Sequence, residues 1–89
     1  MKLIDTVDMM KDNDYKVRLK AEYLQLAIRL ESLEHVIAKY EKGKLPSLKH
    51  ETYILFKKQL EAMRIYLNTL EDRAKIDDIK LQIKWLFYL

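Results

Sequence analysis

The chain has 89 residues, with 17 lysines and arginines, 14 aspartates and glutamates, and no cysteine. A chain this short forms at most one domain and buries only a small core before the loss of conformational entropy cancels the gain. The absence of cysteine excludes disulfides and thiolate metal sites, and it fits a reducing compartment. Self-association is the remaining way to enlarge the core, so we expect a homo-oligomer.

The net charge of +3 is unevenly distributed along the sequence. Residues 1–14 carry two basic and four acidic side chains, whereas residues 15–50 carry eight basic and four acidic ones. This excess favours anions, but it is smaller than the basic surface of most DNA-binding domains. We therefore expect small anions such as nucleotides, rather than nucleic-acid polymers, as partners.

The sequence also bears on location. Its start, MKLIDTVDMMKDND, lacks the basic region and the long apolar run of a signal peptide. No stretch of 18 apolar residues occurs without a charge, which predicts no membrane partner. We expect a soluble, cytoplasmic protein.

The predicted elements begin with a short amphipathic helix over residues 1–12. Its apolar face is expected to consist of Leu3, Ile4, Val7 and Met10. The cluster Asp12-Asn13-Asp14 follows, and residues of this kind cap the start of a helix. A second helix is therefore expected to begin at residue 14.

Two long helices are predicted over residues 14–42 and 48–76, because each segment repeats apolar residues in alternating steps of four and three. The first repeat consists of Leu19, Tyr23, Leu26, Leu30, Leu33, Ile37 and Tyr40. The second consists of Tyr53, Phe56, Leu60, Met63, Leu67, Leu70 and Ala74. The short connection makes the helices antiparallel, so the sequence predicts an all-α, single-domain fold built on a helical hairpin.

Residues 43–47 are predicted to form the turn of this hairpin. Gly43 suits the left-handed position after a helix, and Ser47 can cap the next helix. The hairpin alone leaves a set of apolar residues uncovered, and these require the leading helix or another subunit: Leu24, Ala27, Ile28, Val36, Leu55, Ala62 and Ile65.

Residues 77–89 have a different pattern from the helices. From Ile79 to Leu89, apolar β-favouring residues alternate with others, which favours a strand or an extended arm that pairs with another subunit. A helix and a frayed end are the alternatives. The helix would place one apolar face on Ile76, Ile79, Ile83 and Leu86.

The candidate site lies along one edge of the hairpin. Positions that flank the apolar repeats face each other across antiparallel helices, and here they are Tyr15, Glu22, Arg29 and Val36, then Gln59, Tyr66 and Arg73. A turn near residue 47 pairs Glu22 with Arg73, Arg29 with Tyr66, and Val36 with Gln59. Arg18 and Gln25 lie one strip outward.

An aromatic ring beside guanidinium groups can stack a base and bind a phosphate bidentately. On this interpretation Arg18, Arg29 and Arg73 contact phosphates, Tyr66 and Tyr15 offer stacking faces, and Gln25 and Gln59 contact polar base edges. The ordinary structural interpretation is that the charged residues form solvated Glu–Arg pairs and the tyrosines cover the apolar repeat.

Enzyme motifs are lacking. His35 and His50 are the only histidines and have no metal-ligand spacing, and a single glycine cannot build a phosphate-binding loop. We therefore expect a binding protein that is not an enzyme, with no metal and no cofactor.

Two motifs carry a family resemblance. The first helix reads Y-x-x-R-x-K-x-E-Y-x-Q-L-x-x-R from Tyr15 to Arg29, and the second reads Q-x-x-x-M-x-x-Y-L-x-x-L-x-x-R-A from Gln59 to Ala74. They resemble a family of very small phage proteins seen in crAss-like and other phages. The expected architecture is also similar to the phage sponge proteins that counter CBASS and Thoeris immunity.

This resemblance implies a protein of the infected host cytoplasm that sequesters a cyclic nucleotide or an ADP-ribose-derived immune signal in a pocket between subunits. The candidate residues come from the edge of the hairpin and not from the resemblance. An inhibitor or adaptor that docks a host protein through its apolar helical face is the alternative.

Overall fold

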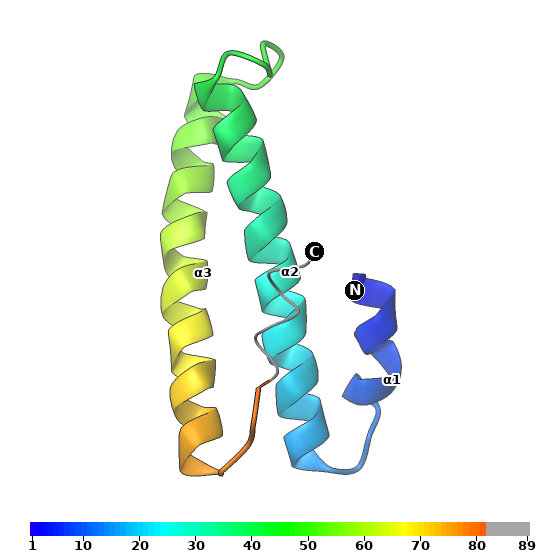
Figure 1. Cartoon of the computed structure of the whole chain (residues 1–89). Coiled ribbons are helices and arrows are strands. Elements are labelled where there is room, and N and C mark those ends of the chain that lie inside the picture. The colour runs from blue at the N-terminus through cyan, green and yellow to red at the C-terminus, as the bar shows by residue number, and fades with distance from the viewer. Residues whose placement is uncertain (82–89) are drawn as a thin grey trace.

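The computed structural model describes residues 1–81. A 3-10 helix, η1 (Leu3–Thr6), runs directly into a one-turn helix, α1 (Val7–Met10). Two helices of 27 residues follow, α2 (Tyr15–Glu41) and α3 (His50–Ile76). They pack as the predicted antiparallel hairpin, with the N-terminal segment against the other side of α2 (Figure 1).

The beginning and end of α2 follow the predicted chemistry. The Asp14 side chain accepts a hydrogen bond from the Lys16 backbone N–H at 2.9 Å and so caps the first turn. After the last turn, Gly43 takes a φ of +72°, and the Lys44 N–H donates to the Lys39 carbonyl at 2.9 Å. These features form a Schellman motif, which stops the helix and starts the turn.

The beginning of α3 differs from the prediction. The helix starts at His50, and its N-cap is Lys49, which makes no capping hydrogen bond with its side chain. The prediction that Ser47 caps this helix was wrong. Ser47 lies inside a tight turn that is closed by the Leu48 N–H and the Leu45 carbonyl at 3.2 Å, so the chain is not yet helical there.

The apolar repeats meet between α2 and α3 as predicted. Near the start of α2, Leu19 and Tyr23 pack in one cluster with Leu70 and Ala74 of α3. Nearer the turn, Leu30 and Ile37 pack with Leu60. At the turn itself the Tyr40 and Tyr53 rings stack with their centroids 4.3 Å apart. These layers fix the register of the hairpin.

The face predicted for the leading helix was wrong. Leu3, Ile4, Val7 and Met10 are all exposed, whereas Thr6 is completely buried. The reason is that the segment begins as a 3-10 helix with three residues per turn, so the 3.6-residue spacing does not define its face. The prediction that this segment covers part of the hairpin was right, since Met1 and Met9 pack on the core.

The chain turns back after α3. Asp78 takes a left-handed φ of +54°, and the Ile79 N–H donates to the Ala74 carbonyl at 2.8 Å, which buries Ile79 in the core. Residues 79–81 belong to no helix or strand. The predicted strand or arm falls mostly on residues 82–89, outside the described residues.

Candidate ligand-binding groove and the neighbouring cluster

The predicted edge residues divide into three groups in the structure. Four of them gather where α2 begins and α3 ends, and we call this group the open-end cluster: Tyr15, Glu22, Tyr66 and Arg73. Three others, Arg29, Val36 and Gln59, line a groove nearer the turn. The last two, Arg18 and Gln25, hold the N-terminal segment.

Arg73 connects the open-end cluster. Its Nη2 donates to the Tyr15 hydroxyl at 3.0 Å, and its Nη1 lies 3.9 Å from the Glu22 carboxylate. The predicted pairing of Glu22 with Arg73 is therefore confirmed. The Arg73 guanidinium also lies 6.0 Å from the centroid of the Tyr15 ring. The cluster is an exposed network in which this arginine already has an acidic partner.

Tyr66 lies beside the same carboxylate. Partial burial, with Glu22 next to the hydroxyl, raises the pKa of Tyr66. The hydrogen bond to Tyr15 raises the pKa of Arg73, which therefore stays a cation. Arg29 was predicted to pair with Tyr66, but it is not among the charged groups that shift the pKa of Tyr66. Those groups are Glu22 and Arg73.

Arg18 and Gln25 make local structural contacts. The Arg18 guanidinium donates to the Asp12 carbonyl at 2.7 Å. The Gln25 amide donates to the buried Thr6 hydroxyl at 2.8 Å and also contacts the Met10 sulfur. Both side chains thus fasten the residues before α2 onto that helix.

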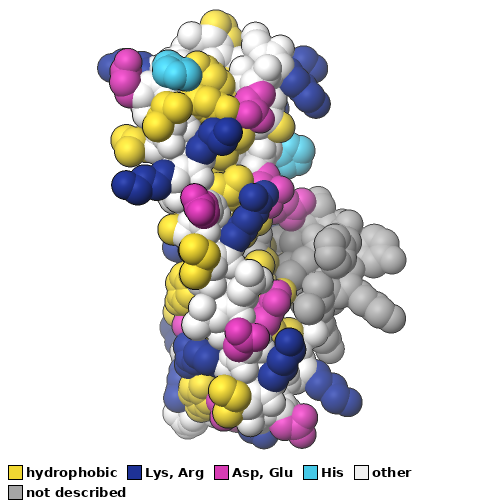
Figure 2. All heavy atoms as spheres, turned by 90° about the vertical axis from the view of Figure 1, so that its left-hand side faces the viewer, with side chains coloured by type: hydrophobic (Ala, Val, Ile, Leu, Met, Phe, Trp, Pro, Cys, Tyr) yellow, Lys and Arg dark blue, Asp and Glu magenta, His cyan; other side chains and the backbone are white. Residues whose placement is uncertain are grey.

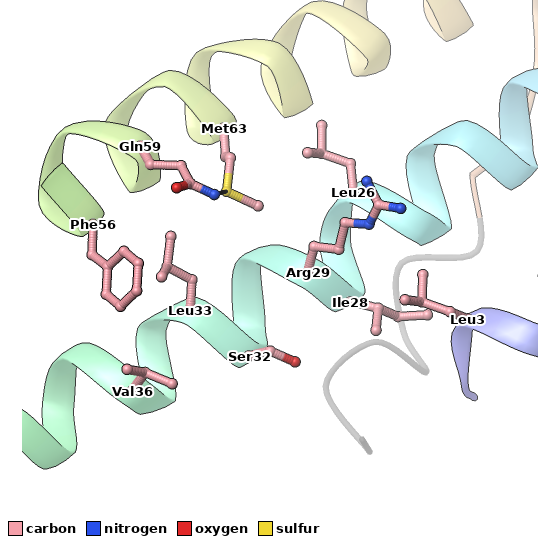
Figure 3. A pocket seen from close by; sticks show the side chains of 10 residues that line it. All are labelled: Leu3, Leu26, Ile28, Arg29, Ser32, Leu33, Val36, Phe56, Gln59 and Met63. Carbon is pink, nitrogen blue, oxygen red and sulfur yellow. Dashed lines mark hydrogen bonds between the residues drawn. The ribbon is translucent and has the colours of Figure 1, made fainter. Parts of the chain in front are cut away.

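A groove of about 600 Å³ lies between the two long helices. Its lining consists of Leu3, Leu26, Ile28, Arg29, Ser32, Leu33, Val36, Phe56, Gln59 and Met63. Figure 3 shows Phe56, Gln59 and Met63 projecting from α3, whereas Arg29 and the leucines beside it come from α2. Leu3 of η1 reaches the groove from the N-terminal segment (Figure 3).

The groove is apolar except at three side chains. Arg29 supplies a guanidinium, Gln59 an amide and Ser32 a hydroxyl, each exposed. Neither ion pair within residues 1–81 involves Arg29; they join Arg64 to Glu34 and Arg73 to Glu22. In the same part of the chain, the Gln59 amide has only a long contact of 4.0 Å to the Met63 sulfur. These polar groups are therefore free to meet a ligand.

Arg29 and Gln59 were predicted as ligand contacts, whereas most other groove residues were not. Phe56 was assigned to the apolar repeat, and it is only half-buried there. Phe56 precedes Gln59 by three residues, so both lie on one side of α3. This spacing could have identified Phe56 as a neighbour of Gln59 in the groove. Leu3 carried no such signal, because its position depends on how η1 packs.

Two further properties of residues 1–81 bear on function. No group of three acidic or histidine side chains lies close enough together to hold a metal ion. None of the helices is long and apolar enough to cross a membrane.

A protein-family model described as Sequestin matches residues 13–76. The chain belongs to the Sequestin family. The match spans α2, the turn and α3, so it contains every predicted site residue and every groove residue except Leu3. Membership of the Sequestin family suggests a sequestering role. No curated protein and no solved structure matches the chain.

Proposed function

We propose that this protein binds a small nucleotide-derived immune signal, a cyclic nucleotide or an ADP-ribose derivative, and sequesters it without cleaving it. Membership of the Sequestin family supports sequestration, and the positive net charge supports an anionic ligand. The groove carries the proposal, because it combines around one hollow an aromatic ring with a guanidinium and an amide that have no ion-pair partner or short hydrogen bond within residues 1–81.

The size of the groove suits a ligand of this class. Small-molecule sites in proteins have volumes of about 300–1,000 Å³ and are mostly apolar, with a few polar groups that orient the ligand. In the groove, Arg29 would bind a phosphate bidentately, Phe56 would offer its ring to a base, and Gln59 would donate to and accept from a base edge. None of these contacts requires chemistry on the ligand.

The open-end cluster is a second contact region in this proposal. Tyr66 is 45% exposed and can stack a base that extends beyond the groove. Arg73 and Tyr15 are bonded to each other, so a phosphate that approached them would have to compete with Glu22 for the guanidinium. We therefore expect Arg29 to contribute more to binding than Arg73.

A ligand panel tests the proposal. Cyclic dinucleotides, cyclic trinucleotides and ADP-ribose isomers are each added to the purified protein while its unfolding is followed. A ligand that binds only the folded state stabilises it by about 2.7 kcal/mol at one hundred times its dissociation constant. The ligand recovered after denaturing the protein should be chemically unchanged. Recovery of a cleaved product would contradict sequestration.

Arginine variants then locate the site. Arg29→Ala should weaken binding of the ligand found in the panel by about ten- to a hundredfold, the effect of losing a charge-assisted bidentate contact. Arg29→Lys should weaken it too, because the charge stays while the planar fork is lost. Arg64→Ala is the matched control, since Arg64 pairs with Glu34 outside the groove. Equal losses for Arg29→Ala and Arg64→Ala would mean diffuse electrostatics instead of a site.

The alternative function is an inhibitor or adaptor that docks a host protein. It is favoured by the exposed isoleucines and leucine on the outer side of α3, which are Ile54, Leu55, Ile65 and Ile76. This alternative predicts that no nucleotide in the panel raises the stability of the protein.

A further inference from the structure

The outer side of α3 carries a second heptad repeat in addition to the one that faces α2. Its members alternate in steps of three and four along the helix, and we call them the outer stripe: Leu55, Lys58, Ala62, Ile65, Thr69, Asp72 and Ile76. All seven are exposed, with Leu55 and Ile65 at 63% and Ile76 at 83%. Figure 2 faces this side of the hairpin and shows hydrophobic side chains at intervals along its length, between charged ones.

The outer stripe is nearly symmetric about Ile65. Lys58 precedes Ile65 by seven residues, and Asp72 follows it by seven. Each charge therefore lies about 10 Å from the centre along the helix axis, at 1.5 Å per residue. Neither residue takes part in an ion pair within residues 1–81. Two copies of α3 that crossed antiparallel at Ile65 would bring Lys58 of each copy to Asp72 of the other.

The residues between these charges suit close packing of two helices. Ala62 and Thr69 flank Ile65 at three and four residues and have small side chains. The Thr69 hydroxyl already donates to the Ile65 carbonyl at 2.9 Å, so its burial would leave no unpaired hydroxyl. Leu55 and Ile76 close the two ends of the stripe with apolar side chains.

We propose that the outer stripe is the contact of a two-fold symmetric dimer in which α3 packs antiparallel against α3 of a second copy. A symmetric contact needs a self-complementary surface, and opposite charges at equal distances from an apolar centre provide one. The result is a four-helix layer in the order α2, α3, α3 and α2. This dimer does not depend on the nucleotide ligand.

The size of the stripe sets the expected strength. A helix of 27 residues is about 40 Å long and about 10 Å wide, so two copies bury roughly 800 Å² in total. Contacts of this size are typical of weak, reversible association. We expect a monomer–dimer equilibrium with a dissociation constant on the order of tens of micromolar, which sedimentation equilibrium resolves.

Charge exchange tests the pairing. Lys58→Asp should raise the dissociation constant of the dimer at least about tenfold, because it places two aspartates together at each end. The double variant Lys58→Asp with Asp72→Lys should restore the value to within about threefold of the original chain. Lys57→Asp is the control, because Lys57 lies on the same helix outside the stripe and should change the constant little. A double variant that stays as weak as Lys58→Asp would overturn the proposal.

The absence of cysteine from the chain allows a test of direction. Ile65→Cys should form a disulfide-linked dimer under mild oxidation, since the two-fold axis passes close to this position. Lys58→Cys mixed with Asp72→Cys should form the mixed dimer, whereas neither variant alone should do so. Glu34→Cys, on α2, is the control that should stay monomeric. Linking of Lys58→Cys to itself would indicate parallel helices and overturn the proposal, and so would a chain that stays monomeric at several hundred micromolar.

Discussion

Helices α2 and α3 have the same length and meet where their apolar repeats pack together, a contact that we call the seam. Even so, α2 buries eight residues and α3 buries three. The difference comes from their neighbours. Helix α2 lies between α3 and the N-terminal segment, so it is covered on two sides, whereas within the described residues α3 has α2 as its only helical neighbour, and Ile79 packs at its end (Figure 1). An amphipathic repeat predicts which side of a helix meets its hairpin partner, and additional neighbours determine how much of the rest is covered.

The contrast is clearest at apolar residues outside the seam. Leu24 of α2 is 5% exposed, and Ala27 beside it is buried as well. Leu55 of α3 is 63% exposed. The two helices therefore have different functions in this fold: α2 is the centre of the core, and α3 carries the surface that is available to other molecules.

Removing a side chain outside the seam should have the largest effect where it is buried. Leu24→Ala should destabilise the fold by about 2–5 kcal/mol, because it removes buried methyl groups and leaves a cavity. Leu55→Ala should change the stability by less than about 0.5 kcal/mol when measured at low micromolar concentration, where the proposed dimer would be dissociated. Urea unfolding followed by circular dichroism gives both values. Equal losses would mean that α3 is covered as fully as α2.

The contact that covers α2 can be weakened without touching the hairpin. Gln25→Ala removes the donor to the buried Thr6 hydroxyl and should cost about 1–2 kcal/mol. Hydrogen exchange of the backbone amides in residues 1–12 should become faster, while exchange in α3 stays unchanged. Gln59→Ala is the matched control, because Gln59 lies on α3 and its amide makes only a long contact with another described residue. Faster exchange throughout the chain would show that the N-terminal segment and the hairpin unfold as one unit.

Alkaline pH tests the hydrogen bond between Tyr23 of α2 and Glu71 of α3. The Tyr23 hydroxyl donates to the Glu71 carboxylate at 3.1 Å, and burial together with this carboxylate raises the pKa of Tyr23 to about 12. Because this folded-state pKa is above the ordinary value of 10, its contribution is complete below pH 10 and is lost as pH rises toward 12.

We expect the chain to lose about 1 kcal/mol through this group between pH 9 and pH 11. Tyr23→Phe should be less stable at neutral pH and should lack this part of the decline. Denaturant titrations of both proteins at several pH values measure the difference. A constant gap between them from pH 7 to pH 11 would contradict the role of the Tyr23–Glu71 bond.

Much of the hairpin was predictable from the sequence because its causes are local. The heptad repeats predicted which residues of α2 and α3 pack together. The single glycine, Gly43, predicted where α2 ends, and it has the expected left-handed φ. The same register predicted the pairing of Glu22 with Arg73, since residues at equal distances from the turn meet across antiparallel helices.

The remaining features depend on tertiary packing, which a periodic pattern does not contain. The buried face of the leading segment differs from the predicted one because η1 winds more tightly than an α-helix. Gln25, predicted as a ligand contact, is bonded to Thr6, a partner from a segment whose placement the repeat does not define. The groove itself required knowing where Leu3 and Phe56 lie together.

The last and smallest difference lies in how the two helices end. Both close with a residue in the left-handed region, which is Gly43 after α2 and Asp78 after α3. A glycine adopts this conformation without strain, whereas a residue with a Cβ does not, although aspartate tolerates it better than most. The same motif is thus built from the favourable residue in one case and an unfavourable one in the other.

Exchanging these residues should move the stability in opposite directions. Gly43→Ala should destabilise by about 1 kcal/mol, and only through backbone strain, because no atom lies within 4 Å of the added Cβ. Asp78→Gly should stabilise by up to about 0.5 kcal/mol, since the relief of strain is partly offset by the greater freedom of glycine in the unfolded chain. Urea unfolding measures both. Loss of stability in Asp78→Gly would mean that the aspartate side chain itself stabilises the turn that carries Ile79 into the core.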